Sequence, residues 1–283
     1  MPVLAELPRS TIHEPPRAAP TLPISVVVVA RNEARNLPRC LASVHGWVSE
    51  IVVALNNTTD ESAAIAAKFG AQVVTLEWKG FRDTKNAALD LARFHWALCL
   101  DADEEVSLPL RSELERAFRS GNVYRYAGMR FPRKVWFIDR WITHGDWYPD
   151  LSLRLVDRRR ARWGGDAYVH EKLECEGPIL RLHGDLHHYS FPSLASQVGK
   201  INLFAELFLQ QQEARGAQFS VAGTLFRSAW RFFRGYVLRL GFLDGFPGLY
   251  IAGSNAFGVF ARCSRLYEAG RHRDPPPLSA SRR

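Results

Sequence analysis

The sequence predicts an α/β protein whose core is a mostly parallel sheet. Through residues 24–100, short runs of β-branched and other apolar residues alternate with amphipathic stretches of helical period. The connections between them are short, and repeated strand–helix–strand units of this kind form parallel sheets with right-handed crossovers. Four carboxylates within residues 101–105 follow the fourth apolar run, at the sheet edge where open α/β folds bind ligands.

Each element of this front half has a local signature. Strands are expected at residues 24–29, 51–54, 72–76 and 96–100, which are rich in Val, Ile and Leu. A helix is expected at residues 36–45, with Pro38 in its first turn. A second should begin at a Thr59 or Asp60 cap and end before Gly70, and a third should run over 83–94 with Asp83 as its cap. The strand ends should therefore gather residues 31–33, 56–58 and 101–105 on one edge.

The pattern changes after residue 120. Strands are expected at 126–131 and 151–156, and strict alternation in the second predicts that its three leucines point inward and that Ser152 and Arg154 point outward. The aromatic stretch between them, residues 136–150, could stack on a sugar ring or could simply anchor its own loop.

Two long helices are expected near the C-terminus, at residues 193–215 and 221–240. In the second, Arg227, Arg231 and Arg234 share one face, and aromatic and aliphatic residues cover the other. Such a helix is typical of a membrane interface, although a core-packed helix with a solvated arginine face gives the same pattern. Residues 246–261 fall short of the roughly 20 apolar residues that a spanning helix needs, so we expect peripheral attachment.

Composition narrows the range of partners and compartments. The 283 residues carry a net charge of +8 with a pI of about 9.6, which favours anionic partners. The four cysteines form no C-x-x-C pair, so neither a zinc site nor a disulfide framework is expected, in keeping with a reducing cytoplasm. No signal peptide is recognised, and the proline-rich residues 1–23 and the final residues 271–283 are expected to be flexible tails.

The acidic cluster after the fourth strand is the strongest chemical signal. Asp101 and Asp103 are two positions apart, so in an extended segment their carboxylates point to the same side. Adjacent carboxylates repel unless a proton or cation lies between them, and Mg²⁺ commonly binds one or two carboxylates together with substrate phosphates. An acidic helix start is the alternative interpretation of the same residues.

Together these blocks resemble a family 2 glycosyltransferase of the GT-A, Rossmann-like fold, and more narrowly the bacterial lipopolysaccharide-core β-glucosyltransferases. The resemblance extends over residues 24–268, and the ordered set of blocks is specific although each alone is not. The matching blocks are VVVVARNE at 26–33, TTD at 58–60, IAAKFG at 65–70, EWKGF at 77–81, KNAAL at 85–89, LDADE at 100–104, RWITHGDWYPD at 140–150, LRL at 153–155, VHE at 169–171, HY at 188–189, WRFF at 230–233 and GFLDG at 241–245.

The expected organisation is a catalytic GT-A domain at residues 24–192 and a helical region at 193–270, for which membrane association and core packing are the two alternatives. The resemblance adds an activity. It implies a metal-dependent transfer of a sugar, with inversion, from a nucleotide diphosphate. The expected site residues are Asp101 and Asp103 for Mg²⁺ or Mn²⁺, Asp101 also for the ribose, the loop from Ala30 through Arg31 to Glu33 for the nucleotide, and Lys85 for the base or phosphates. The family's base-reading aspartate is replaced by Leu55, so Asn56 or Asn57 is expected to contact the base; a UDP-sugar is the first choice of donor.

Inverting transfer also needs a carboxylate that accepts the proton of the acceptor hydroxyl. Glu171 is the first candidate, with Asp150 and then Asp146 in reserve, although His170 and Glu171 could instead form a structural ion pair or a loop cap. His144 and His170 could add to a metal shell, and His187 and His188 are expected to pack or hydrogen-bond locally.

We therefore expect a hexosyltransferase, cytoplasmic and peripheral at the inner face of the bacterial plasma membrane. Its acceptor would be a lipopolysaccharide-core or other lipid-linked glycan, reached by contact with the anionic membrane surface. The alternatives are a sugar transferase to polyprenyl phosphate and a non-catalytic nucleotide- or sugar-binding protein. Nucleic acid is not an expected partner, because the predicted ligand edge is acidic and the basic residues come late in the chain.

Overall fold

The computed structural model describes residues 21–165, 171–191, 193–213 and 219–271. A ten-stranded mixed sheet forms the core, in the order β3-β2-β1-β4-β8-β6-β12-β5, with β7 and β11 paired to β6. Its strands are β1 (Leu22–Ala30), β2 (Val48–Leu55), β3 (Gln72–Thr75), β4 (Trp96–Asp101), β5 (Glu104–Val106), β6 (Gly128–Phe137), β7 (Arg140–Trp141), β8 (Asp150–Asp157), β11 (Ile179–Arg181) and β12 (Leu186–His188).

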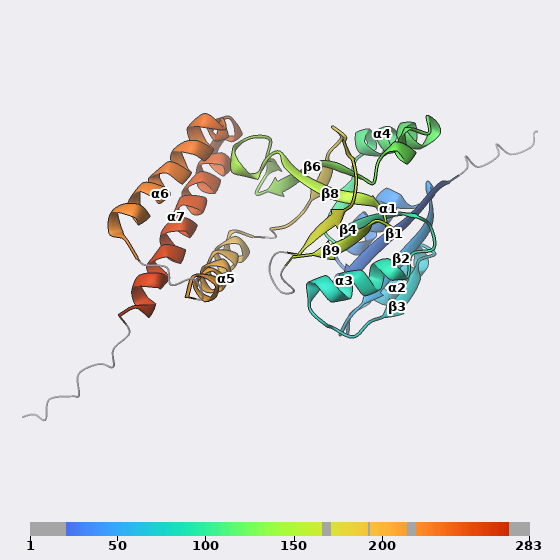
Figure 1. The fold of residues 1–283 in the computed structure, drawn as a ribbon, viewed down its shortest axis with the longest axis horizontal. Helices are drawn as coiled ribbons and strands as arrows, with labels where there is room; N and C mark the ends of the chain where they lie inside the picture. Colours follow the sequence, from blue (N-terminus) through green and yellow to red (C-terminus); the bar gives the residue numbers. More distant parts are fainter. Residues whose placement is uncertain (1–20, 166–170, 192, 214–218, 272–283) are drawn as a thin grey trace, which may run out of the picture.

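The first four strands run parallel, as the sequence predicts, and β8 then joins β4 in the opposite direction. Helices cover both faces of this parallel half (Figure 1). The side chains of α1, α2 and α4 pack on one face, while α3 and the hairpin of β9 and β10 pack on the other. The bounds of these elements are α1 (Leu37–Val44), α2 (Ser62–Lys68), α3 (Phe81–Asp90), α4 (Leu108–Arg119), β9 (Ala161–Gly164) and β10 (Lys172–Cys175).

Some expected boundaries differ from the structure. Asp60 does not cap α2 but accepts the Ser62 and Ala34 amides at 3.0 Å, which ties the start of α2 to the loop after β1. The third helix begins at Phe81 rather than at Asp83, whose carboxylate pairs with Arg82 instead. The strand expected at 126–131 is longer, because β6 continues into a hairpin with β7.

The C-terminal helices lie together to one side of the sheet (Figure 1). The long helix α7 packs against both α5 and α6, and its Ile251 joins Val135, Phe137 and Ile142 in a small apolar core that fixes the β6–β7 hairpin. The bounds are α5 (Leu194–Glu213), α6 (Val221–Phe233), a π-helical turn η3 (Arg234–Leu238), a 3-10 turn η4 (Gly241–Asp244) and α7 (Gly245–Ala269); shorter 3-10 turns are η1 (Asn122–Arg125) and η2 (Gly145–Trp147). Within the described residues, none of the helices combines the length and hydropathy that crossing a bilayer requires.

The arginine face predicted for α6 is only partly solvated: Arg227 is exposed, whereas Arg231 and Arg234 are engaged by an acidic side chain. Arg231, Arg234 and Arg239 surround the buried carboxylate of Asp146, with nitrogen–oxygen distances of 3.1, 2.8 and 3.3 Å. The opposite face of α6 is exposed and apolar, with 71% of Phe226, 48% of Trp230 and 45% of Phe233 open to solvent. Asp146 therefore orients α6 so that its aromatic side faces outward.

Candidate functional site

The three predicted loops do meet at the carboxyl end of the parallel strands. Asp101 is the last residue of β4 and pairs with Val29 of β1, while Ala30 pairs with Leu55 at the end of β2. The acidic residues after Asp101 do not start a helix but form a tight turn into β5. In this turn the Glu104 carboxylate accepts the backbone N–H of Asp101 at 2.9 Å.

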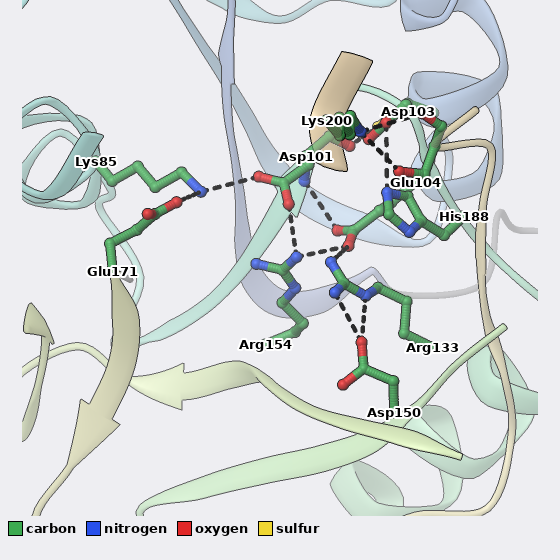
Figure 2. Close-up of polar contacts among 12 residues, drawn as sticks. Lys85, Asp101, Asp103, Glu104, Arg133, Asp150, Arg154, Glu171, His188 and Lys200 are labelled. Atoms are coloured by element: carbon green, nitrogen blue, oxygen red, sulfur yellow. Dashed lines mark hydrogen bonds and ion pairs between the residues drawn. The ribbon is translucent and has the colours of Figure 1, made fainter. Parts of the chain in front are cut away.

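Two cations hold the Asp101 carboxylate, one at each oxygen. Lys85 Nζ lies 3.0 Å from Oδ1, and an Arg154 guanidinium nitrogen lies 2.6 Å from Oδ2 (Figure 2). Burial by itself raises the pKa of Asp101, but Arg154 and Lys85 outweigh it and hold that pKa well below its usual range. Asp101 is therefore an ionised carboxylate in a fixed orientation.

Lys85 also connects Asp101 to the candidate base. Its amine lies 3.1 Å from Glu171 Oε1 and 4.4 Å from the centre of the Trp163 ring. The neighbouring Asn86 fixes Trp163 from behind, donating to its carbonyl and accepting from its N–H at 2.9 Å each. Lys85, in the middle of α3, thus links Glu171 to the end of β4.

A second set of charged side chains connects Asp101 to Asp150. Glu104 is fully buried and receives Arg154 at 2.6 Å and Arg133 at 3.4 Å. Arg133 in turn binds Asp150, the reserve candidate for the base, at 2.7 Å (Figure 2). Asp150 is thus at the far end of a network that begins at Asp101.

Asp103 points to the other side of the turn, into a cavity of about 690 Å³. Its carboxylate lies 3.4 Å from His188 Nε2, which comes from β12. Burial raises the pKa of Asp103, but the hydrogen bond and charge of His188 lower it by more, so the net shift is downward. Further lining residues include Asn32, Glu33, Arg39, Trp136, Tyr189 and Lys200.

These residues fit a divalent ion at Asp103 better than at Asp101. The Asp103 and His188 atoms are close enough to bind one ion, and an oxygen and an imidazole nitrogen suit Mn²⁺ or Mg²⁺ when phosphates and water complete the shell. Both oxygens of Asp101, by contrast, are already occupied by cations. Among the described residues, no three His, Cys, Asp or Glu side chains form a ready-made metal cage.

The expected nucleotide residues have different environments. Glu33 lines the cavity. Its pKa is raised by burial and by the negative charges of Asp103, Asp60 and Asp101, and the hydrogen bond that Asn36 donates to it offsets only part of this rise. Asn56 is buried and its N–H donates to the Ala30 carbonyl at 3.2 Å, so it shapes the loop. Arg31 is exposed.

Two further candidates are engaged elsewhere. His144 is bound to the buried Asp244, with 3.1 Å between Nδ1 and Oδ1. Asp146 is enclosed by Arg231, Arg234 and Arg239. His187 stacks on Trp141 with ring centres 4.2 Å apart, so it packs locally as expected. His170 lies outside the described residues.

Sequence reasoning missed Arg154, Arg133 and Lys200. The alternation in β8 predicts that Arg154 points outward, and this is wrong: the residue is 6% exposed and its guanidinium neutralises Asp101 and Glu104. Buried carboxylates repel each other unless a cation lies among them, so the sequence already implies a nearby positive charge. That this charge comes from Arg154 follows only from the pairing of β8 with β4.

Comparisons with known proteins identify the family of the chain. Residues 25–164 match the family model for glycosyl transferase family 2. An uncharacterized glycosyltransferase of Rickettsia felis is 29% identical over 87% of this chain and 90% of its own length. The lipopolysaccharide core biosynthesis glycosyltransferase LpsC of Rhizobium meliloti is 26% identical over 88% of this chain and 93% of its own.

Among solved structures, S. aureus TarS 1–349 in complex with UDP-GlcNAc aligns with a TM-score of 0.44 and 12% identity, over 90% of this chain and 94% of that one. The α/β architecture, the acidic turn after β4 and the sequence relatives lead to one assignment. The chain is a glycosyltransferase and belongs to glycosyl transferase family 2, with its family domain at residues 25–164.

Proposed function

We propose that this glycosyltransferase moves a hexose, with inversion, from a nucleotide-diphosphate donor to a lipopolysaccharide-core or other lipid-linked glycan. The observation that carries the proposal is the Lys85 amine, which lies about equally far from Asp101 and Glu171, at 3.0 and 3.1 Å. It holds a candidate base beside the acidic turn whose other carboxylate, Asp103, faces a cavity of about 690 Å³.

Asp103 and His188 would hold Mg²⁺ or Mn²⁺. When bound, the ion acts as a Lewis acid that offsets the charge of the leaving diphosphate. Asp101, fixed by Arg154 and Lys85, is then suited to accept hydrogen bonds from the donor's ribose or sugar hydroxyls. Its role as a metal ligand remains a prediction, and a UDP-sugar remains the first choice of donor.

Glu171 is the proposed base. Lys85 donates to its Oε1, and among the described residues none hydrogen-bonds Oε2, which leaves that oxygen for the acceptor hydroxyl. The acceptor oxygen attacks the anomeric carbon while its proton moves to Glu171. Asp150 is the second candidate, but it is bound to Arg133 and connected to Asp101 only through Glu104 and Arg154.

We further propose that α6, η4 and the start of α7 rest on the anionic inner face of the bacterial plasma membrane. Residues 219–267 contain six arginines and one acidic residue, Asp244, which is buried. Exposed aromatic residues beside surplus positive charge are the composition of interfacial helices. The relative named for lipopolysaccharide core biosynthesis supports an acceptor at this surface.

A thermal-shift screen tests the donor and metal parts together. UDP, GDP, ADP and CDP are each added with and without Mn²⁺, and one of them should raise the unfolding temperature only when the metal is present. Mass spectrometry of reactions with the matching nucleotide sugars then identifies the hexose. Equal, metal-independent responses to all four nucleotides would contradict the proposal.

A further inference from the structure

Lys200 is a cation that has no ion-pair partner among the described residues. It lies on α5 and lines the same cavity as Asp103. Its amine donates to the carbonyl and hydroxyl oxygens of Ser190 at 3.3 and 3.2 Å and lies 4.5 Å from the centre of the Phe191 ring. No carboxylate of the described residues is within ion-pair distance of it, whereas Lys85 has two such partners.

The position of Lys200 is set by the packing of α5 on α7. Gln197, one turn earlier, donates to Ser254 Oγ at 3.3 Å and accepts from the Tyr250 hydroxyl at 3.2 Å. Figure 2 shows Lys200 together with Asp103 and His188, on the opposite side of Asp101 from Lys85 and Glu171. Helix α5 therefore contributes Leu194 and the cation Lys200 to the lining of the cavity.

We infer that Lys200 binds the diphosphate of the donor and stabilises it as it leaves; this inference rests on the proposed function. In the bound donor the diphosphate is esterified at both ends, and one divalent ion offsets its charge. When the bond between the anomeric carbon and the β-phosphate oxygen breaks, the electron pair remains on that oxygen and adds a further negative charge. The new bond forms to the acceptor oxygen, whose proton is taken by Glu171. An ammonium group opposite Asp103 and His188 is placed to meet the added charge.

Arg35 and Arg39 also line the cavity, but their positions suit this role less well. The Arg39 guanidinium lies 3.8 Å above the centre of the Tyr189 ring and is held there by the aromatic face. Both arginines belong to the loop and helix after β1, where the nucleotide itself is expected. Lys200 approaches instead from the C-terminal helices, on a flexible side chain whose only hydrogen bonds to described residues go to Ser190.

Binding of inorganic pyrophosphate tests the inference without assuming which base or sugar the donor carries. Isothermal titration calorimetry with Mn²⁺ present compares the wild type, Lys200→Met, Lys200→Arg and Lys68→Met, a control that removes the same charge from an exposed position at the end of α2. We expect Lys200→Met to bind Mn²⁺–pyrophosphate about 10- to 100-fold more weakly, and Lys200→Arg within roughly threefold of the wild type, because a hydrogen bond to a charged group is lost only in the first. Lys68→Met should bind normally.

Different results would contradict the proposed function and the role of Lys200. A wild type that binds neither pyrophosphate nor any of the four nucleoside diphosphates would overturn the proposed function and this inference with it. A wild type that binds them, with Lys200→Met binding equally well, would overturn the role of Lys200 alone. Lys200→Gln repeats the comparison if the Met variant unfolds, and thermal unfolding of each variant verifies the fold.

Discussion

Arg154 reaches Asp101 from the neighbouring strand, with 2.6 Å between a guanidinium nitrogen and Oδ2, and the same nitrogen lies 2.6 Å from Glu104. One buried cation thus serves two carboxylates of the acidic turn. Because burial opposes every one of these charges, the turn depends on Arg154 for its conformation.

Replacing Arg154 with Met should destabilise the protein by about 3 kcal/mol, because two largely buried carboxylates lose their shared partner. Urea unfolding at pH 7 measures this, and Arg130→Met, which removes an exposed arginine from the adjacent strand β6, is the matched control. A loss no greater than that of the control would show that the turn does not need the guanidinium.

The pH dependence has a definite sign. The folded-state pKa of Asp101 lies below its unfolded value, so its contribution to stability is present above about pH 4 and is lost as the pH falls from there through the folded pKa. The stability difference between the wild type and Arg154→Met should therefore be largest near neutral pH and shrink below pH 4. A difference that grows on acidification would contradict this account.

The parallel half of the fold was predictable because its signals are local. Val26 to Val29 and the runs at 51–54 and 96–100 are short, β-branched or apolar and bounded by turns, and each became a strand of the expected direction. Arg154 was not predictable in this way. Alternation along β8 predicts the buried face only when the other side of the strand is solvated. In β8 the consecutive residues Arg154, Leu155 and Val156 are all buried, so both faces of this stretch are covered.

The same limit applies to the rest of the site. The motif at 101–103 and its strand-end position are readable from the sequence, and so is the proximity of Lys85. The partner of Asp103, His188, lies on a strand that joins β6 late in the chain, and the partners of Asp146 are about 90 residues away from it. Such contacts follow from topology, which local periodicity does not encode.

Asp103→Asn and His188→Gln should each abolish the Mn²⁺-dependent part of nucleotide stabilisation while leaving the unliganded unfolding temperature within a few degrees. Asp103 lines the cavity and His188 is its ion-pair partner, so each substitution removes one charged contact and little packing. The thermal-shift screen provides the measurement, with Asp90→Asn, an exposed carboxylate at the end of α3, as the control. Retained metal dependence in both variants would remove this pair as the ion's ligands.

Glu171→Gln should lower kcat by about 10²- to 10⁴-fold, the usual contribution of a positioned base, and change the KM for the donor little. Glutamine still accepts a hydrogen bond from Lys85, so the local geometry should survive. Steady-state release of the nucleoside diphosphate measures both constants, and Glu174→Gln on β10 is the nearby control. Weaker donor binding with an unchanged kcat would mean that Glu171 binds substrate instead, and Asp150→Asn would then be the next variant.

The exposed side of α6 is aromatic and apolar. Asp146 holds Arg231 and Arg234 toward the body of the protein, so the side turned outward presents Phe226, Trp230 and Phe233.

Flotation with vesicles should therefore show binding to phosphatidylglycerol-containing bilayers, weaker binding at high salt, and little binding to neutral phosphatidylcholine. The combined change of Phe226, Trp230 and Phe233 to Ser should abolish flotation. Tyr124→Ser, which removes an exposed aromatic residue from the turn η1 that follows α4, should not. Release of nucleoside diphosphate to water should persist in the triple variant, because these residues lie outside the cavity lined by Asp103 and Lys200. Equal binding to neutral and anionic vesicles, or flotation that survives the triple change, would place the lipid contact elsewhere on the chain.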